Sequence, residues 1–267
     1  MKINRRQFVR NLGLGTASLS MGSLISTSSC APSGDSRDKR GKVSDDDQFL
    51  FIGDDIAIAQ TEYGKVQGYL LNHVYTFLGV PYGADTSGKN RFMPPQKPEP
   101  WTDVRPAVFY GNTAPQRMEN RWPNNYGTFA DHWNYWDVSE DCLYLNVWTP
   151  GIADGKKRPV LVWLHGGGFT NGSGIEQDGY HGENISREGD IVFCSINHRL
   201  GPIGFSDLSG VGGEAYKDSG NVGMLDIIAA LRWVHDNIAN FGGDPGNVTV
   251  MGQSGGGSKV CTVCLLY

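Results

Sequence analysis

One stretch decides the fold: Val248-Thr-Val-Met-Gly-Gln-Ser-Gly-Gly256. Its first four residues are a short apolar run of the kind that forms a buried strand, and residues 252–256 fit the pattern G-x-S-x-G. Where a strand reverses sharply into a helix, one hydroxyl stays exposed at the tip, and side chains two residues to either side would collide. The glycines at positions 252 and 256 fit such a turn, so the sequence predicts that Ser254 is an exposed nucleophile.

The same glycines could instead begin a phosphate-binding loop. That motif needs Gly-Lys followed by Ser or Thr after its spacer residues, whereas Gly257-Ser258-Lys259 has the wrong order. The pattern therefore favours the nucleophile interpretation.

A second glycine-rich turn, His165-Gly-Gly-Gly-Phe169, directly follows the apolar run 160–164. Consecutive glycines let backbone N–H groups point at one spot that side chains would otherwise obstruct. We expect the amides of Gly167 and Gly168, together with that of Gly255, to form an oxyanion hole. A glycine-rich turn can also simply end a strand, but the later G-x-S-x-G motif favours the functional interpretation.

The surrounding pattern predicts an α/β fold. Three continuous apolar runs are typical of parallel strands that helices cover on both faces: residues 143–148, 160–164 and 191–196. An amphipathic helix is predicted over 222–240, and the Gly242-Gly-Asp-Pro245 turn ends it. Earlier runs predict a small antiparallel start: residues 56–60, 64–68 and 74–78. We therefore expect a mostly parallel sheet with a small antiparallel N-terminal part.

Composition excludes several classes of protein. The chain has 267 residues, of which 39% are hydrophobic and 19% charged, which is unlike a disordered chain, a collagen or a coiled coil. The first 29 residues hold four of the 23 basic residues and no acid, so the rest carries 19 basic against 28 acidic residues. This acidic balance argues against a nucleic-acid partner.

The N-terminus is predicted to be a targeting signal. Residues 1–29 place Arg5 and Arg6 before a weakly apolar run, as in a twin-arginine signal peptide, which predicts export to a bacterial periplasm. Small residues before Cys30 leave open a lipoprotein cleavage site and hence a membrane-anchored lipoprotein. Residues 30–53 are predicted to be a flexible tether, and 54–267 the folded domain.

Other residues carry weaker signals. The four later cysteines show no regular disulfide framework, and Cys261 and Cys264 alone do not make a zinc site, so we expect no metal or cofactor. Both are expected to be small buried residues on one helix face. An aromatic run over 122–136 either covers the core edge or lines an apolar pocket.

Beyond these motifs, the chain resembles the type B carboxylesterase family, which includes para-nitrobenzyl esterases and cholinesterases. The resemblance covers about 55–267 and rests on residues 77–82, 140–146, 197–201, 220–226 and 241–245. It implies an α/β-hydrolase fold and hydrolysis of a small-molecule ester through an acyl-enzyme on Ser254. A non-catalytic binding or adhesion module of the same fold is the alternative, although such a module has no use for an intact serine and oxyanion turn.

Two departures from the family pattern matter. Many members pair Cys142 with an upstream Cys, but the equivalent stretch here is Thr113-Ala-Pro-Gln116, which implies a free thiol. The family triad runs Ser, then Glu or Asp, then His, whereas the residues after Ser254 include none of these partners. We expect the N-terminal part of a longer enzyme, or a truncated product, cut after the nucleophile elbow and with negligible turnover by itself. His165 precedes the triple-glycine turn, His198 follows a predicted strand and His235 lies on the predicted helix. None is where family members have the base, so all three are expected to be structural.

Overall fold

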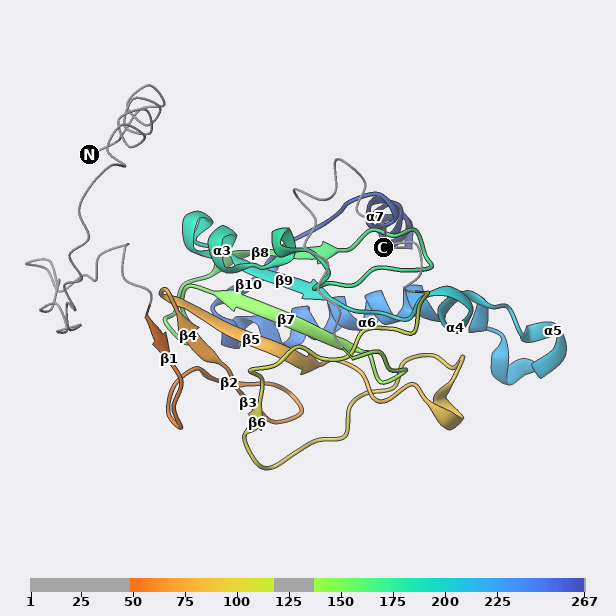
Figure 1. Cartoon of the computed structure of the whole chain (residues 1–267), viewed down its shortest axis with the longest axis horizontal. Coiled ribbons are helices and arrows are strands. Elements are labelled where there is room, and N and C mark those ends of the chain that lie inside the picture. The colour runs from red at the N-terminus through yellow and green to blue at the C-terminus, as the bar shows by residue number, and fades with distance from the viewer. Residues whose placement is uncertain (1–48, 118–136, 267) are drawn as a thin grey trace, which may run out of the picture. The chain divides into compact units, whose positions relative to one another are not determined.

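The computed structural model describes residues 49–117 and 137–266 (Figure 1). The predicted signal peptide, Cys30, most of the predicted tether and the aromatic run 122–136 lie outside the described residues. Residues 50–51 form strand β1 (Leu50–Phe51), which pairs with strand β4 (Tyr69–Leu71). The folded domain therefore begins before residue 54, earlier than predicted, because these two residues join the sheet edge.

Seven strands form the main sheet in the order β1-β4-β5-β7-β9-β8-β10 (Figure 1). The bounds of the other five are β5 (Val74–Pro81), β7 (Tyr144–Thr149), β8 (Arg158–Leu164), β9 (Val192–Ile196) and β10 (Gly243–Gly252). The pairs β8–β9 and β8–β10 are parallel, and the other neighbouring pairs are antiparallel. The sheet is therefore mixed, with its parallel part at the C-terminal end of the chain.

Strand β7 corrects one prediction. The run 143–148 was expected to be parallel to its neighbours, but β7 is antiparallel to both β5 and β9. The strand is nonetheless buried along almost its whole length. A continuous apolar run reports burial on both faces of a sheet and carries no information on strand direction. The antiparallel part of the sheet is therefore larger than predicted, while the α/β class is confirmed.

A second, three-stranded sheet contains β2 (Ile58–Gln60), β3 (Lys65–Gln67) and β6 (Arg105–Pro106). The strands β2 and β3 form the antiparallel pair that the sequence predicts. Within the described residues, the helices are α3 (Glu183–Gly189), α4 (Gly201–Phe205), α5 (Ser209–Gly212), α6 (Val222–Asn237) and α7 (Gly255–Leu266). Short 3-10 turns occupy η1 (Gly88–Asn90), η2 (Asp178–Tyr180), η3 (Glu214–Tyr216), η4 (Ser219–Asn221) and η5 (Ile238–Phe241).

Helices α3 and α6 lie on opposite faces of the main sheet (Figure 1). On the α6 side, Ile227, Ala230 and Val234 join one apolar core with alternate residues of the strands. On the other side, Trp148 and Phe193 belong to a smaller cluster of buried residues. Successive strand residues point to opposite faces, so neighbours such as Val147 and Trp148 serve different cores.

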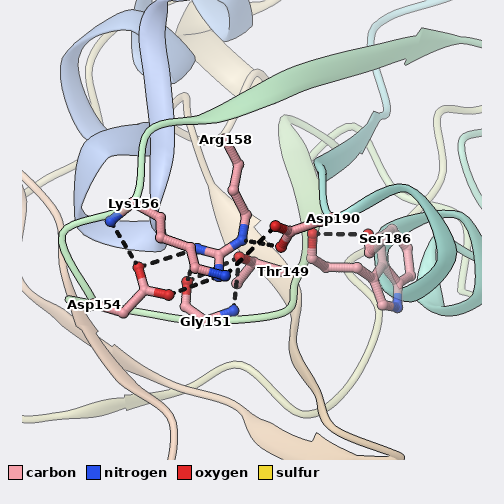
Figure 2. A network of polar contacts seen from close by, with 8 residues as sticks. Thr149, Gly151, Asp154, Lys156, Arg158, Ser186 and Asp190 are labelled. Carbon is pink, nitrogen blue, oxygen red and sulfur yellow. Dashed lines mark hydrogen bonds and ion pairs between the residues drawn. The ribbon is translucent and has the colours of Figure 1, made fainter.

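The start of β8 is held by a polar network around Arg158 (Figure 2). The Arg158 side chain is only 4% exposed, and its guanidinium group binds both carboxylate oxygens of Asp154, at 2.6 and 3.1 Å. Its Nε donates to Asp190 at 2.7 Å, and this guanidinium lowers the pKa of both carboxyls. Arg158 thus ties the turn before β8 to the residue that ends α3.

Replacing Arg158 tests how much this network contributes to the free energy of unfolding. We expect Arg158→Ala to lower the free energy of unfolding by about 3 kcal/mol, because a buried charge-paired group is lost. The matched control is Lys156→Ala, since Lys156 pairs with Asp190 at 3.5 Å between two exposed side chains and should leave stability almost unchanged. Urea denaturation followed by circular dichroism measures both, and equal effects would contradict the assignment.

Candidate active site

The predicted strand-to-helix turn lies where β10 ends at Gly252 and α7 begins at Gly255. Between them, Ser254 has a φ angle of 55°, in the left-handed region, and is exposed. This conformation costs a non-glycine residue about 1–2 kcal/mol. Strain of this kind persists only where the surrounding structure holds the backbone in place.

Glycine is required on both sides of Ser254 by close packing. A Cβ atom at Gly256 would overlap the carbonyl oxygen of Leu164 and lie 2.8 Å from that of His165. A Cβ atom at Gly252 would lie 2.5 Å from the carbonyl carbon of Gly256. The backbone of the turn therefore lies directly against the end of β8, as the motif implies.

The triple-glycine turn leaves the sheet beside this elbow. Because Gly252 pairs with Leu164 in the parallel register of β10 and β8, both chains leave the same edge of the sheet at the same level. A Cβ atom at Gly255 would lie 2.5 Å from the Cα atom of Gly168 and 2.6 Å from its nitrogen. The structure thus brings together the two motifs that the sequence singled out.

The three predicted donor amides are available. Gly167 and Gly168 have positive φ angles of 82° and 64°, which only glycine adopts at low cost. The carbonyl of Gly167 accepts from the amides of Thr170 and Asn171, at 3.3 and 3.2 Å, and this closes the turn. No described residue accepts a hydrogen bond from the amides of Gly167, Gly168 or Gly255. Such amides can bind an oxyanion.

A buried ion pair supports the far end of the turn. Arg199, after β9, binds Asp226 of α6 through two contacts, of 2.8 and 2.6 Å, and both side chains are completely buried. The backbone amide of Gly201 then donates to the carbonyl of Phe169 at 2.7 Å. The fixed segment 199–201 therefore holds the residue that follows the three glycines.

No described residue is placed as a base for Ser254, since none makes a hydrogen bond to its hydroxyl. The buried rings of His165 and His198 stack at 4.8 Å, and each Nδ1 contacts a backbone carbonyl at 2.9 Å. Burial lowers the pKa of His198 well below its ordinary value. His235 is exposed and contacts Asp236 at 2.7 Å. Structural roles agree with the burial of His165 and His198, whereas His235 lies at the surface.

The burial of the cysteines agrees with one expectation and contradicts another. Cys142 is a free and buried thiol. Cys261 and Cys264, expected to be buried, are exposed. The inner face of α7 is instead occupied by small or long residues at helical spacing: Gly255, Gly256, Lys259 and Val263. The prediction was wrong because the CxxC spacing falls on the opposite face of the helix.

Neither a metal centre nor a membrane span is seen in the described part of the chain. Over residues 49–117 and 137–266, no group of His, Cys, Asp and Glu is placed to hold a metal ion. Within the same ranges, no helix has both the length and the apolar character needed to cross a bilayer. A cavity of about 580 Å³ lies between α6 and residues 94–97, and neither Ser254 nor the three glycines line it.

Lys259 is the residue near the site that sequence reasoning missed. In the sequence, its order after Gly257-Ser258 served only to exclude a phosphate-binding loop. Helical spacing could have found it, since positions 255, 256, 259 and 263 share one face of the helix that follows Ser254. Its side chain is completely buried, and its Nζ lies 3.4 Å from the carbonyl oxygen of His165.

The chain is similar in sequence and fold to known esterases. Residues 55–266 match the sequence model of the carboxylesterase family, and the chain belongs to this family. It is 43% identical over 209 residues to the para-nitrobenzyl esterase of Bacillus subtilis (strain 168) and 44% identical over 206 residues to the phenmedipham hydrolase of Pseudarthrobacter oxydans. The fold is similar to that of an esterase from Clostridium hathewayi, with a TM-score of 0.74 and 44% identity. The α/β-hydrolase fold expected from the resemblance is thereby confirmed.

The similarity covers most of this chain but less than half of each relative. The chain matches over 77% of its length to 40% of the Bacillus esterase and 39% of the phenmedipham hydrolase. The structural match covers 80% of this chain and 41% of the Clostridium esterase. The chain therefore spans about two-fifths of the length of these relatives.

Two adjacent glycines of α7 provide a test of the close packing. We expect Gly256→Ala to cost about 2–3 kcal/mol, since the added methyl group overlaps the backbone at the end of β8. Gly257→Ala is the matched control: its nearest neighbour would be at 3.5 Å, and alanine should stabilise the helix by about 0.5 kcal/mol. Thermal unfolding of the two variants checks the difference, and equal melting temperatures would contradict the packing.

Proposed function

We propose that this chain supplies the nucleophile and the oxyanion hole of a serine carboxylesterase that hydrolyses small-molecule esters. The observation that carries the proposal is the backbone contact of Gly168 with Gly255, which puts the two glycine-rich motifs beside the exposed Ser254. Membership of the carboxylesterase family supports the same reaction class.

The reaction is proposed to run through an acyl-enzyme. The Oγ atom of Ser254 attacks the ester carbonyl carbon while a base takes its proton, and the carbonyl oxygen gains a negative charge. The amides of Gly167, Gly168 and Gly255 stabilise that charge. When the intermediate collapses, the carbon–oxygen bond of the ester breaks and the alcohol leaves with the proton. A water molecule then attacks the acyl carbon and releases the acid and the serine.

A base is required because a serine hydroxyl is a weak nucleophile until its proton is removed. No described histidine forms a hydrogen bond with Ser254, so we propose that the histidine and its acidic partner lie outside the described residues. Substitution of a triad member elsewhere leaves only ~10³–10⁴-fold catalysis over water, from the oxyanion hole and binding. Residues 49–266 are therefore proposed to position the substrate carbonyl and stabilise its charge.

We also propose, from the N-terminal sequence, that the protein is exported from the cytoplasm. Arg5 and Arg6 in the first 29 residues support export through a twin-arginine signal, and Cys30 would then be available for a lipid anchor. Peptide mapping of the protein recovered from a periplasmic extract, or from the membrane, would show where the chain is cleaved and whether Cys30 carries lipid.

The function is tested on the complete gene product that contains residues 1–267. We expect a fluorophosphonate probe to label Ser254 and the protein to hydrolyse p-nitrophenyl acetate, with both lost in Ser254→Ala. The matched control is Ser258→Ala, an exposed serine one turn further along α7, which should retain both activities. Hydrolysis that survives Ser254→Ala would sink the proposal.

Residues 1–267 expressed by themselves should turn over esters poorly. The physical reason is that no described base forms a hydrogen bond with the hydroxyl of Ser254, which is a weak nucleophile while it keeps its proton. We expect initial rates with p-nitrophenyl acetate close to those of the Ser254→Ala variant of the same chain. Robust saturable hydrolysis that depends on Ser254 would show that a base is present within these residues.

A further inference from the structure

Lys259 of α7 has no part in the reaction described above, yet it lies completely buried beside the site. An ammonium group is expensive to bury unless strong partners replace the water that it loses. Among the described residues, no carboxylate lies within ion-pair distance of its Nζ atom. A buried and weakly paired cation at this place therefore requires an explanation.

The contacts of Lys259 are with the two ends of the triple-glycine turn. Its Nζ donates to the carbonyl oxygen of His165, at 3.4 Å, and lies 5.3 Å from the centre of the Phe169 ring. These two residues immediately precede and follow the three glycines. A cation over an aromatic face is attracted by the ring. One side chain on the nucleophile helix thus reaches both ends of the oxyanion turn.

The other charged and titratable groups nearby come from three segments. Glu176, in the loop after the turn, is buried and its charge favours the protonated lysine. His165 and His198 stack against each other, and the lysine charge is among the causes that lower the pKa of His198. Arg199 is paired with Asp226. The charge of Lys259 is therefore favoured by Glu176 but is not neutralised by direct contact.

We propose that Lys259 is a positioning residue of this site: its ammonium group holds both ends of the triple-glycine turn and places a positive charge beside the oxyanion hole, so that ester hydrolysis requires the lysine to be protonated. The inference rests on the proposed esterase function. It adds a group that acts through the turn, whereas the nucleophile and the three amides act on the substrate directly.

This role predicts a loss of activity in mildly alkaline solution. Burial lowers the pKa of Lys259 to about 8, so the charge disappears well below the pH at which an exposed lysine loses its proton. In the unfolded chain the lysine keeps its proton up to about pH 10.4. Between these values the unfolded state binds more protons, so this group makes the folded state more stable as the pH rises. Unfolding through Lys259 would not account for the loss.

The experiment measures kcat/KM for p-nitrophenyl acetate from pH 6 to 10 in the complete gene product, with the Ser254→Ala rate subtracted and thermal unfolding recorded at each pH. We expect kcat/KM to fall about tenfold through a pKa near 8 while the protein stays folded. This is less than the ~10²–10³ of a direct oxyanion donor, because the lysine acts indirectly.

Three variants separate a charge effect from a packing effect. Lys259→Met should fold, show about tenfold lower kcat/KM at pH 7, and lose the alkaline fall. Lys259→Arg keeps its charge to high pH, so its activity should no longer fall between pH 7 and 9. Lys217→Met, at an exposed lysine paired with Glu214, is the matched control and should keep the wild-type profile.

Several results would overturn the inference. A wild-type kcat/KM that stays constant from pH 7 to 9 would do so without any variant, even if Lys259→Met failed to fold. An unchanged alkaline fall in Lys259→Met would also do so. The absence of both hydrolysis and probe labelling of Ser254 at every pH would overturn the proposed function and this inference together.

Discussion

The site depends on one close contact between two backbones. The carbonyl end of β8 and the first turn of α7 approach so closely that a methyl group at Gly255 or Gly256 would collide with main-chain atoms of the neighbouring segment. Because peptide groups meet here without side chains between them, the backbone after β8 lies directly against the backbone after β10. The strained conformation of Ser254 is held by the same contact.

The parallel pairing of β8 and β10 makes this contact possible. In a parallel pair the carboxyl ends of both strands reach the same edge of the sheet, and ligands of open α/β sheets bind beyond that edge. The register of Gly252 with Leu164 then puts the two turns at the same level. A shift of one residue would turn every side chain to the opposite face and separate the glycines.

Buried polar groups surround this contact. The Arg199–Asp226 pair fixes the segment that holds Phe169, and Lys259 reaches the same turn from α7. Such groups are costly to bury, and replacing ion pairs with apolar residues is often neutral or stabilising. Their presence beside the triple-glycine turn therefore fits a requirement for fixed geometry better than a contribution to stability alone. The three glycines allow the backbones to approach closely, and the buried polar groups hold the turn in place.

Much of this arrangement could be predicted from local patterns. The glycines around Ser254, the triple-glycine turn and the apolar runs indicated a strand–turn–helix nucleophile and an α/β fold, because each pattern reflects a local steric or burial requirement. The sequence could not give the direction of β7, since burial on both faces looks the same for parallel and antiparallel neighbours. The expectation that Cys261 and Cys264 are buried failed for a related reason: which side of α7 packs inward depends on the segments that contact the helix.

The sequence by itself determined which residues could form a nucleophile and an oxyanion turn. The reason is that a sharp bend requires glycine at particular positions, and this steric requirement can be recognised from single residues. Only the tertiary structure decided that the two motifs meet and that Lys259 is buried against them. Those facts depend on strand order and register, which bring together segments far apart in the chain and which no local pattern encodes.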